Sequence, residues 1–304
     1  IADVDVIHHN LFTNQIAYLM LAFDCKKVPD ELLPYVGLLS SVLGLMDTHR
    51  HTYPELTNEI NINSGGISTD AAIYTDSKDF SKYTVMYEVK GKVLYEKLPF
   101  VLEMMYEIIY ETKFEDEKRL REIIARIKSR MESNMTGSGH TVAMLSAMAQ
   151  FSPSSYYSDI LRGYQYYEFI EKADRDFDSM KEMLAENLKR TAALIFTKEN
   201  LTVSFTAEDD GLELLQKPMT EFVAKLAQLQ GKDAVRTFRP VKEKTAYTSS
   251  SQVQYVARCG NYRKAGYEYT GALKVLKIIF SYDYLWLNVR VKGGAYGCMS
   301  GFYR

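Results

Sequence analysis

An arginine, two glycines and a tyrosine follow one another closely in the stretch RVKGGAYG, as Arg290, Gly293, Gly294 and Tyr296. A guanidinium is a permanent cation and a phenol is a neutral hydrogen-bond donor. Together they suit the binding and polarising of a carbonyl or carboxylate oxygen. The same two side chains also suit a buried Arg–Tyr contact that fixes a corner of the backbone. Residue spacing leaves both interpretations open.

The flanking residues predict how these side chains are positioned. The stretch YLWLNVRVKGG predicts a helix that carries Arg290 in its last turn and ends at Gly293 and Gly294, which we expect to form a structural turn. The following residues, AYGCMSGFY, alternate small and large side chains. This alternation predicts a strand over 295–303 that begins close to Tyr296.

Histidines earlier in the chain raise the question of a metal site. His49 and His51 have alternate spacing, with Glu55 and Glu59 nearby. No third ligand follows at a helical or strand spacing, so solvated loop histidines are the favoured interpretation over metal ligands. The other histidines are predicted to be structural or exposed: His8, His9 and His140. The sequence contains no Cys-x-x-Cys pair, P-loop or dinucleotide fingerprint.

Composition narrows the class of protein. The 304 residues are 46% hydrophobic and 25% charged, which is typical of a globular protein, and the net charge of −2 gives no reason to expect a nucleic-acid partner. No basic cluster suggests a membrane surface, and the longest apolar run is too short to span a bilayer. Three scattered cysteines favour a reducing compartment, the cytoplasm or an organelle matrix. The chain begins with Ile1 and stops within a predicted strand, so we expect a piece of a longer protein.

Alternating strands and helices predict an α+β fold. Residues 1–230 are predicted to form one complete domain, an antiparallel sheet covered on one face by helices. Residues 231–251 are predicted to be a linker, and residues 252–304 the first part of a second domain with a strand at 252–259 and a helix from about Tyr269. The strands of the first domain are predicted at 14–24, 62–74, 82–90 and 200–207; its helices are predicted at 29–46, 94–109, 120–131, 141–150, 156–170, 176–190 and 211–230.

Charged pairs at i,i+4 spacing mark the helix predicted around residue 125. Glu117 precedes Arg121 and Glu122 precedes Arg126 by four residues each. Such pairs are typical of a solvated helix face, which is the interpretation favoured here.

The motif YLWLNVRVKGGAYG resembles the fourth domain of the pitrilysin/insulinase zinc metallopeptidases, in the presequence-protease branch. The stretch SQVQYVARCGNYRKAGYEYTGALKVLKIIF is similar to the start of that domain. Three further stretches resemble the third domain of these enzymes: HHNLFTNQIAYLMLAFD, YPELTNEININSGGIS and SKYTVMYEVKGK. The resemblance extends over nearly the whole chain.

The resemblance implies a clamshell of four homologous α+β domains that closes over an unstructured peptide. In the family, zinc is held by a His-x-x-Glu-His helix and a downstream Glu in the first domain, and an Arg and a Tyr of the fourth domain reach the substrate carbonyl. The matching positions are Arg290 and Tyr296. The implied partners are a peptide substrate and the N-terminal half of the same polypeptide, with neither nucleic acid nor membrane.

The sequence also departs from the catalytic pattern of the family. No His-x-x-Glu-His occurs, and the helix in the corresponding place, YVGLLSSVLGLMD at 35–47, has no His or Glu. We therefore expect no metal site in this segment, no peptidase activity of the segment alone, and zinc only in the longer parent protein. The alternative is a non-catalytic scaffold or peptide-binding member of the family. A scaffold has no need of the Arg–Tyr pair, which favours the enzyme.

Overall fold

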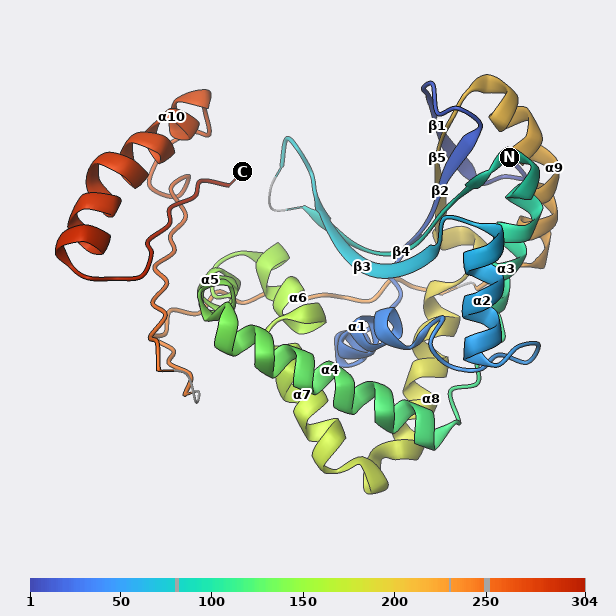
Figure 1. Cartoon of the computed structure of the whole chain (residues 1–304), viewed down its shortest axis with the longest axis horizontal. Helices are drawn as coiled ribbons and strands as arrows, with labels where there is room; N and C mark the ends of the chain where they lie inside the picture. Colours follow the sequence, from blue (N-terminus) through green and yellow to red (C-terminus); the bar gives the residue numbers. More distant parts are fainter. Residues whose placement is uncertain (80–81, 230, 249–251, 304) are drawn as a thin grey trace. The chain divides into compact units, whose positions relative to one another are not determined.

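The computed structural model describes residues 1–79, 82–229, 231–248 and 252–303 (Figure 1). The chain divides into two compact units, Ile1–Arg258 and Cys259–Arg304. The sequence-based boundaries, with a linker at 231–251, stay a prediction beside this contact-based division. The described part of the chain contains no helix that is both long enough and apolar enough to cross a membrane.

The first unit contains a five-stranded sheet in the order β1-β5-β2-β4-β3. Its strands are β1 (Asp5–Asn10), β2 (Ile16–Asp24), β3 (Ile67–Thr75), β4 (Tyr83–Leu94) and β5 (Leu201–Ala207). The pairs β2–β5, β2–β4 and β3–β4 are antiparallel. The pair β1–β5 is parallel, so the predicted all-antiparallel sheet is wrong at this edge. The α+β fold class itself is confirmed.

One face of this sheet is buried and the other is open. Along β5, the alternate residues Leu201, Val203, Phe205 and Ala207 are buried, as the period-2 pattern of a half-buried strand requires. Their neighbours in register on β2 are also buried, and they belong to one core with the helices. The opposite face exposes large side chains on three strands: Ile7, Tyr18 and Tyr74.

Helices pack on the buried face, and α1, α3, α6 and α9 contact the strands directly (Figure 1). The α-helices of this unit are α1 (Leu33–Val42), α2 (Tyr53–Asn63), α3 (Leu98–Tyr110), α4 (Glu117–Gly137), α5 (Gly139–Ala149), α6 (Pro153–Arg162), α7 (Tyr164–Arg175), α8 (Phe177–Ile195) and α9 (Asp209–Lys225). Short 3-10 turns precede α1, α3 and β5: Asp30–Leu32, Tyr95–Lys97 and Lys198–Asn200. The predicted cover of helices on one face of the sheet is therefore present.

Helix α2 was not predicted, and the strand predicted from residue 62 begins only at Ile67. The signal for α2 is in the sequence. Thr52 and Glu55 form a capping box, in which each side chain satisfies a backbone N–H of the other residue, and Pro54 occupies the first turn. The single helix predicted over 156–170 is also wrong, because α6 ends at Arg162 and α7 begins at Tyr164.

Helix α1 approaches the end of α6 very closely. A Cβ atom added to Gly37 would clash with the backbone carbonyl of Leu161 and touch the ring of Tyr166. Only glycine at position 37 therefore permits this packing distance between α1 and α6.

The second unit is built around one long helical segment. α10 (Gly271–Ile279) continues directly into the π-helix η4 (Phe280–Lys292). The strands predicted at 252–259 and 295–303 are not present, since no residue of the described range 252–303 is in a strand. Side chains hold the last residues instead: the Tyr262 hydroxyl donates to the Tyr303 carbonyl at 2.8 Å, and the hydroxyls of Ser281 and Ser300 lie 3.1 Å apart.

Gly37→Ala should lower the free energy of unfolding by about 1–3 kcal/mol, because the new methyl group forces α1 away from α6. Urea unfolding followed by circular dichroism measures this change. Gly137→Ala is the matched control, since Gly137 is also helical but an added Cβ meets nothing within 4 Å. That variant should be as stable as the parent chain or slightly more stable. Equal losses in both variants would contradict a specific close approach at Gly37.

Candidate functional site

Arg290 lies in the last turn of η4, as the sequence predicts for the end of a helix. Its guanidinium carbon lies 4.8 Å from the centre of the Trp286 ring, one helical turn earlier. A cation over an indole face is attracted by about 0.5–1 kcal/mol at an exposed site. This contact orients the guanidinium while leaving its N–H groups able to bind an acceptor.

The two glycines after η4 form the corner that follows Arg290. Gly293 caps the helix, and a Cβ there would lie 2.6 Å from the Val289 carbonyl oxygen. Gly294 has φ of +72°, and its N–H donates to the Arg290 carbonyl at 3.0 Å. Glycine adopts this left-handed conformation without the strain that a side chain brings. The backbone thus turns sharply within two residues of the end of the helix.

Tyr296 follows this corner and is 85% exposed. Within the described residues 252–303, no hydrogen bond or ring contact joins Tyr296 to Arg290. The two side chains therefore do not form the buried contact that was the alternative interpretation of their spacing. They present a cation and a phenol donor separately, from the helix end and from the residues after the turn.

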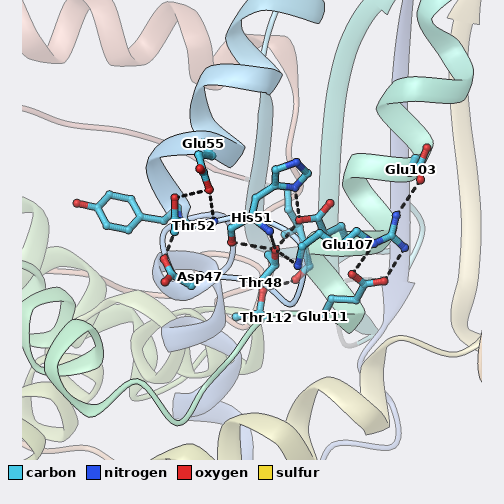
Figure 2. Close-up of polar contacts among 12 residues, drawn as sticks. Asp47, Thr48, His51, Thr52, Glu55, Glu103, Glu107, Glu111 and Thr112 are labelled. Atoms are coloured by element: carbon cyan, nitrogen blue, oxygen red, sulfur yellow. Dashed lines mark hydrogen bonds and ion pairs between the residues drawn. The ribbon is translucent and has the colours of Figure 1, made fainter.

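A second polar cluster lies in the first unit, where the loop 47–52 meets α3 (Figure 2). Glu107 of α3 is completely buried, and its Oε1 lies 2.8 Å from Nδ1 of His51 and also accepts from the Thr48 hydroxyl. The second carboxylate oxygen, Oε2, has no hydrogen-bond partner in the described structure. The His51 ring is 30% exposed. The interpretation of His51 as a solvated loop histidine is therefore wrong.

The Arg50 side chain is 39% exposed and extends this cluster to the protein surface. It donates from Nε and Nη2 to the Glu111 carboxylate at 2.7 and 2.6 Å, and from Nη1 to Glu103 at 2.8 Å. Glu103 and Glu107 of α3 and Glu111, the C-cap of that helix, are spaced four residues apart and face the same loop. A backbone hydrogen bond also joins the loop to this region, since the His49 N–H donates to the Glu111 carbonyl at 3.0 Å. The cluster fixes the α1–α2 connection to α3.

This cluster does not have the composition of a metal centre. Glu55 caps α2 through Thr52 instead of facing His51. Helix α1, which the resemblance places in correspondence with the family's zinc helix, has the sequence LPYVGLLSSV and offers no His, Cys, Asp or Glu. Nowhere in the described ranges do three such residues gather as they would around a metal ion. The described residues therefore do not fit a zinc site.

Sequence reasoning missed the role of Glu107 and the other glutamates of α3. The available signal was a charged residue within an apolar stripe, because Met104, Met105 and Ile108 surround Glu107 along the helix and are buried. A buried carboxylate requires partners. His51 and Thr48 supply them from a loop more than fifty residues earlier in the chain.

Two family models together match most of the chain. The family described as associated with subfamily C of the M16 peptidases matches residues 1–172. The PreP C-terminal domain matches residues 244–304. Their order along the chain agrees with the resemblance to third and fourth domains stated from the sequence.

Curated relatives align with nearly the whole chain. Protein HypA of Clostridium perfringens is 34% identical over 100% of the chain, presequence protease 1 (chloroplastic/mitochondrial) of Arabidopsis thaliana is 29% identical over 99%, and the mitochondrial presequence protease of Xenopus tropicalis is 24% identical over 97%. The chain spans only 31%, 28% and 32% of the lengths of these proteins.

Solved structures support the fold. A conserved protein from Enterococcus faecalis V583 superposes with a TM-score of 0.61 at 15% identity, covering 98% of this chain and 69% of that protein. The peptidase M16 inactive domain from Pseudomonas fluorescens gives a TM-score of 0.51 at 15% identity, covering 78% of this chain and 52% of that domain.

Glu107→Gln should lower the free energy of unfolding by about 1–3 kcal/mol, because the amide loses the charged acceptor shared by Thr48 and His51 and buries an unpaired N–H group. Glu103→Gln makes the same chemical change at an exposed ion pair on the same helix and should cost no more than about 0.5 kcal/mol. Thermal and urea unfolding of the two variants test the difference. If Glu103→Gln were the more damaging change, the attachment of loop 47–52 to α3 would depend on Arg50 instead of Glu107.

Proposed function

The chain belongs to the family associated with subfamily C of the M16 peptidases, and from this premise we propose that it forms the substrate-enclosing segment of a zinc-dependent metalloendopeptidase that degrades unstructured peptides. Support comes from the two family models, in the order expected for this part of such an enzyme, and from relatives named presequence proteases. A cytoplasmic or organelle-matrix location stays a prediction.

The proposed division of labour follows from the residues that this chain lacks. Zinc would supply Lewis-acid chemistry from another part of the longer protein, because α1 carries no ligand. The first unit has the fold of an inactive M16 domain and would act as a wall of the enclosure. The implied partners are the peptide and the N-terminal half of the same polypeptide.

The Arg290–Tyr296 corner is the proposed point of contact with the reacting peptide bond. Negative charge grows on the carbonyl oxygen as a tetrahedral intermediate forms, and a neutral phenol donor stabilises it there. The observation that carries this role is the 85% exposure of Tyr296 just after the glycine corner, together with the contact that orients Arg290 over the Trp286 ring. In this role Arg290 binds a neighbouring carbonyl and positions the peptide.

A non-catalytic scaffold or peptide-binding protein is the second candidate. One of the similar solved structures favours it, because that domain has this fold and is described as an inactive domain of an M16 peptidase. The two candidates differ in whether Tyr296 affects turnover.

Tyr296→Phe in the full-length protein should lower kcat by about 10²–10³-fold with a much smaller change in KM, because it deletes one oxyanion donor and keeps the ring. Steady-state hydrolysis of a quenched fluorogenic peptide measures both constants. Tyr282→Phe is the matched control, since Tyr282 is 69% exposed on η4 and has no assigned role. Turnover by the Tyr296→Phe protein within twofold of the parent enzyme would exclude the oxyanion role.

The chain of 304 residues alone should bind no stoichiometric zinc and hydrolyse no peptide, because zinc sites in proteins require three or four converging ligands. Elemental analysis after gel filtration in zinc-containing buffer, together with the same fluorogenic assay, measures both properties. One zinc ion retained per chain would contradict the proposed division of labour.

A further inference from the structure

A cleft of about 550 Å³ lies in the first unit where α1, β3, α4, α6 and α7 come together. These elements contact one another directly and are labelled in Figure 1. The volume is within the usual range of ligand pockets, roughly 300–1,000 Å³. The cleft lies apart from the Glu107 cluster and contains no residue of the second unit.

Three arginines line this cleft: Arg126 and Arg130, one turn apart on α4, and Arg162 at the end of α6. The arginine ion pairs of the described residues involve Arg50, Arg119, Arg121, Arg175 and Arg236. None of the three cleft arginines has a carboxylate partner within the described part of the chain. Asp70 is the one carboxylate among the lining residues, so two positive charges are in excess.

The sequence suggests a partner for Arg126 that the structure does not provide. Glu122, four residues earlier, instead pairs with Arg119 at 3.1 Å. Arg121 pairs with Asp178 of α8. Arg126 is exposed, as expected for a solvated face of α4, and it also lines the cleft.

A buried phenol adds a second, independent sign of a ligand. Tyr166 lines the cleft and is only 4% exposed, and its hydroxyl has no hydrogen-bond partner that satisfies normal geometry. Burial raises the pKa of this phenol, although the nearby Arg130 charge and Ser41 hydroxyl act to lower it. The hydroxyl therefore stays protonated and available as a donor. An unpaired buried donor is costly, and a bound acceptor would satisfy it.

We propose that this cleft binds a peptide segment carrying two neighbouring carboxylates, with Arg126, Arg130 and Arg162 as cationic contacts and Tyr166 as a neutral donor. Planar guanidinium groups match carboxylates through paired hydrogen bonds. The size of the cleft and the two excess charges favour two acidic side chains over a single small anion. Ser41 and Thr69, the latter on the edge strand β3, supply further polar groups beside the arginines. The site is independent of the Arg290–Tyr296 corner.

Fluorescence anisotropy with the complete chain tests this site. The probe is a labelled Gly-Ser peptide containing two adjacent glutamates, and the comparison peptide has glutamine at both positions. The acidic peptide should bind at least about tenfold more tightly, and added salt should weaken it, because exposed charge pairs are screened. Equal binding of the two peptides would overturn the proposal. Binding of inorganic phosphate at the cleft without binding of the acidic peptide would also overturn it.

Variants separate the cleft from general surface charge. Arg126→Gln with Arg130→Gln should abolish the preference for the acidic peptide, while Arg190→Gln with Arg239→Gln removes the same charge outside the cleft and should preserve it. Arg162→Gln is a second test at the other helix, and circular dichroism verifies folding. Equal losses in the cleft and control variants would overturn the proposal.

Tyr166→Phe distinguishes ligand binding from a structural role. It should weaken binding of the acidic peptide several-fold with little change in the free energy of unfolding, because the hydroxyl makes no hydrogen bond of normal geometry in the free protein. A destabilised variant with unchanged peptide affinity would contradict the assignment of Tyr166. Tyr296→Phe should bind the acidic peptide normally, so a failure of this proposal and a failure of the proposed peptidase role are distinguishable.

Discussion

The enclosure of α1 is the constraint on which the first unit depends. This helix packs against β3 and against α4, α6 and α8, and most of its residues are buried. Apolar side chains and Gly37 satisfy that position, since any larger residue at 37 collides with the backbone of α6. Helix α1 contains no His, Cys, Asp or Glu. Its contribution to the first unit is therefore the packing of apolar side chains and of Gly37.

Two buried polar groups of this unit, Glu107 and Tyr166, differ in what surrounds them. Glu107 is buried with His51 and Thr48 and fixes a loop to α3. Tyr166 is buried without such a partner and borders a cleft rich in arginine. Removal from water is unfavourable for both polar groups. They differ in whether neighbouring side chains provide hydrogen bonds. The first group serves stability, and the second is a candidate for recognition.

The second unit has a different physical character. Its long helix exposes large apolar side chains, among them Ile278, Tyr282, Trp286 and Val291. Leu285 of the same helix is buried. Exposed apolar surface of this kind is typical of a segment that packs on further protein. This character agrees with the match of residues 244–304 to the PreP C-terminal domain and with the fraction of its relatives that the chain spans.

The sequence by itself determined the α+β class, the family, most helices and the strand β5, because these depend on local periodicity and on motifs such as RVKGGAYG. The capping box of α2 was equally local and was overlooked. Only the tertiary structure decided that β1 pairs in parallel with β5, that His51 reaches Glu107, and that Arg126 faces a cleft instead of Glu122. Each of these joins an element to a distant one. Residue spacing determines which side chains share a face of an element, whereas the packing between elements determines what that face meets.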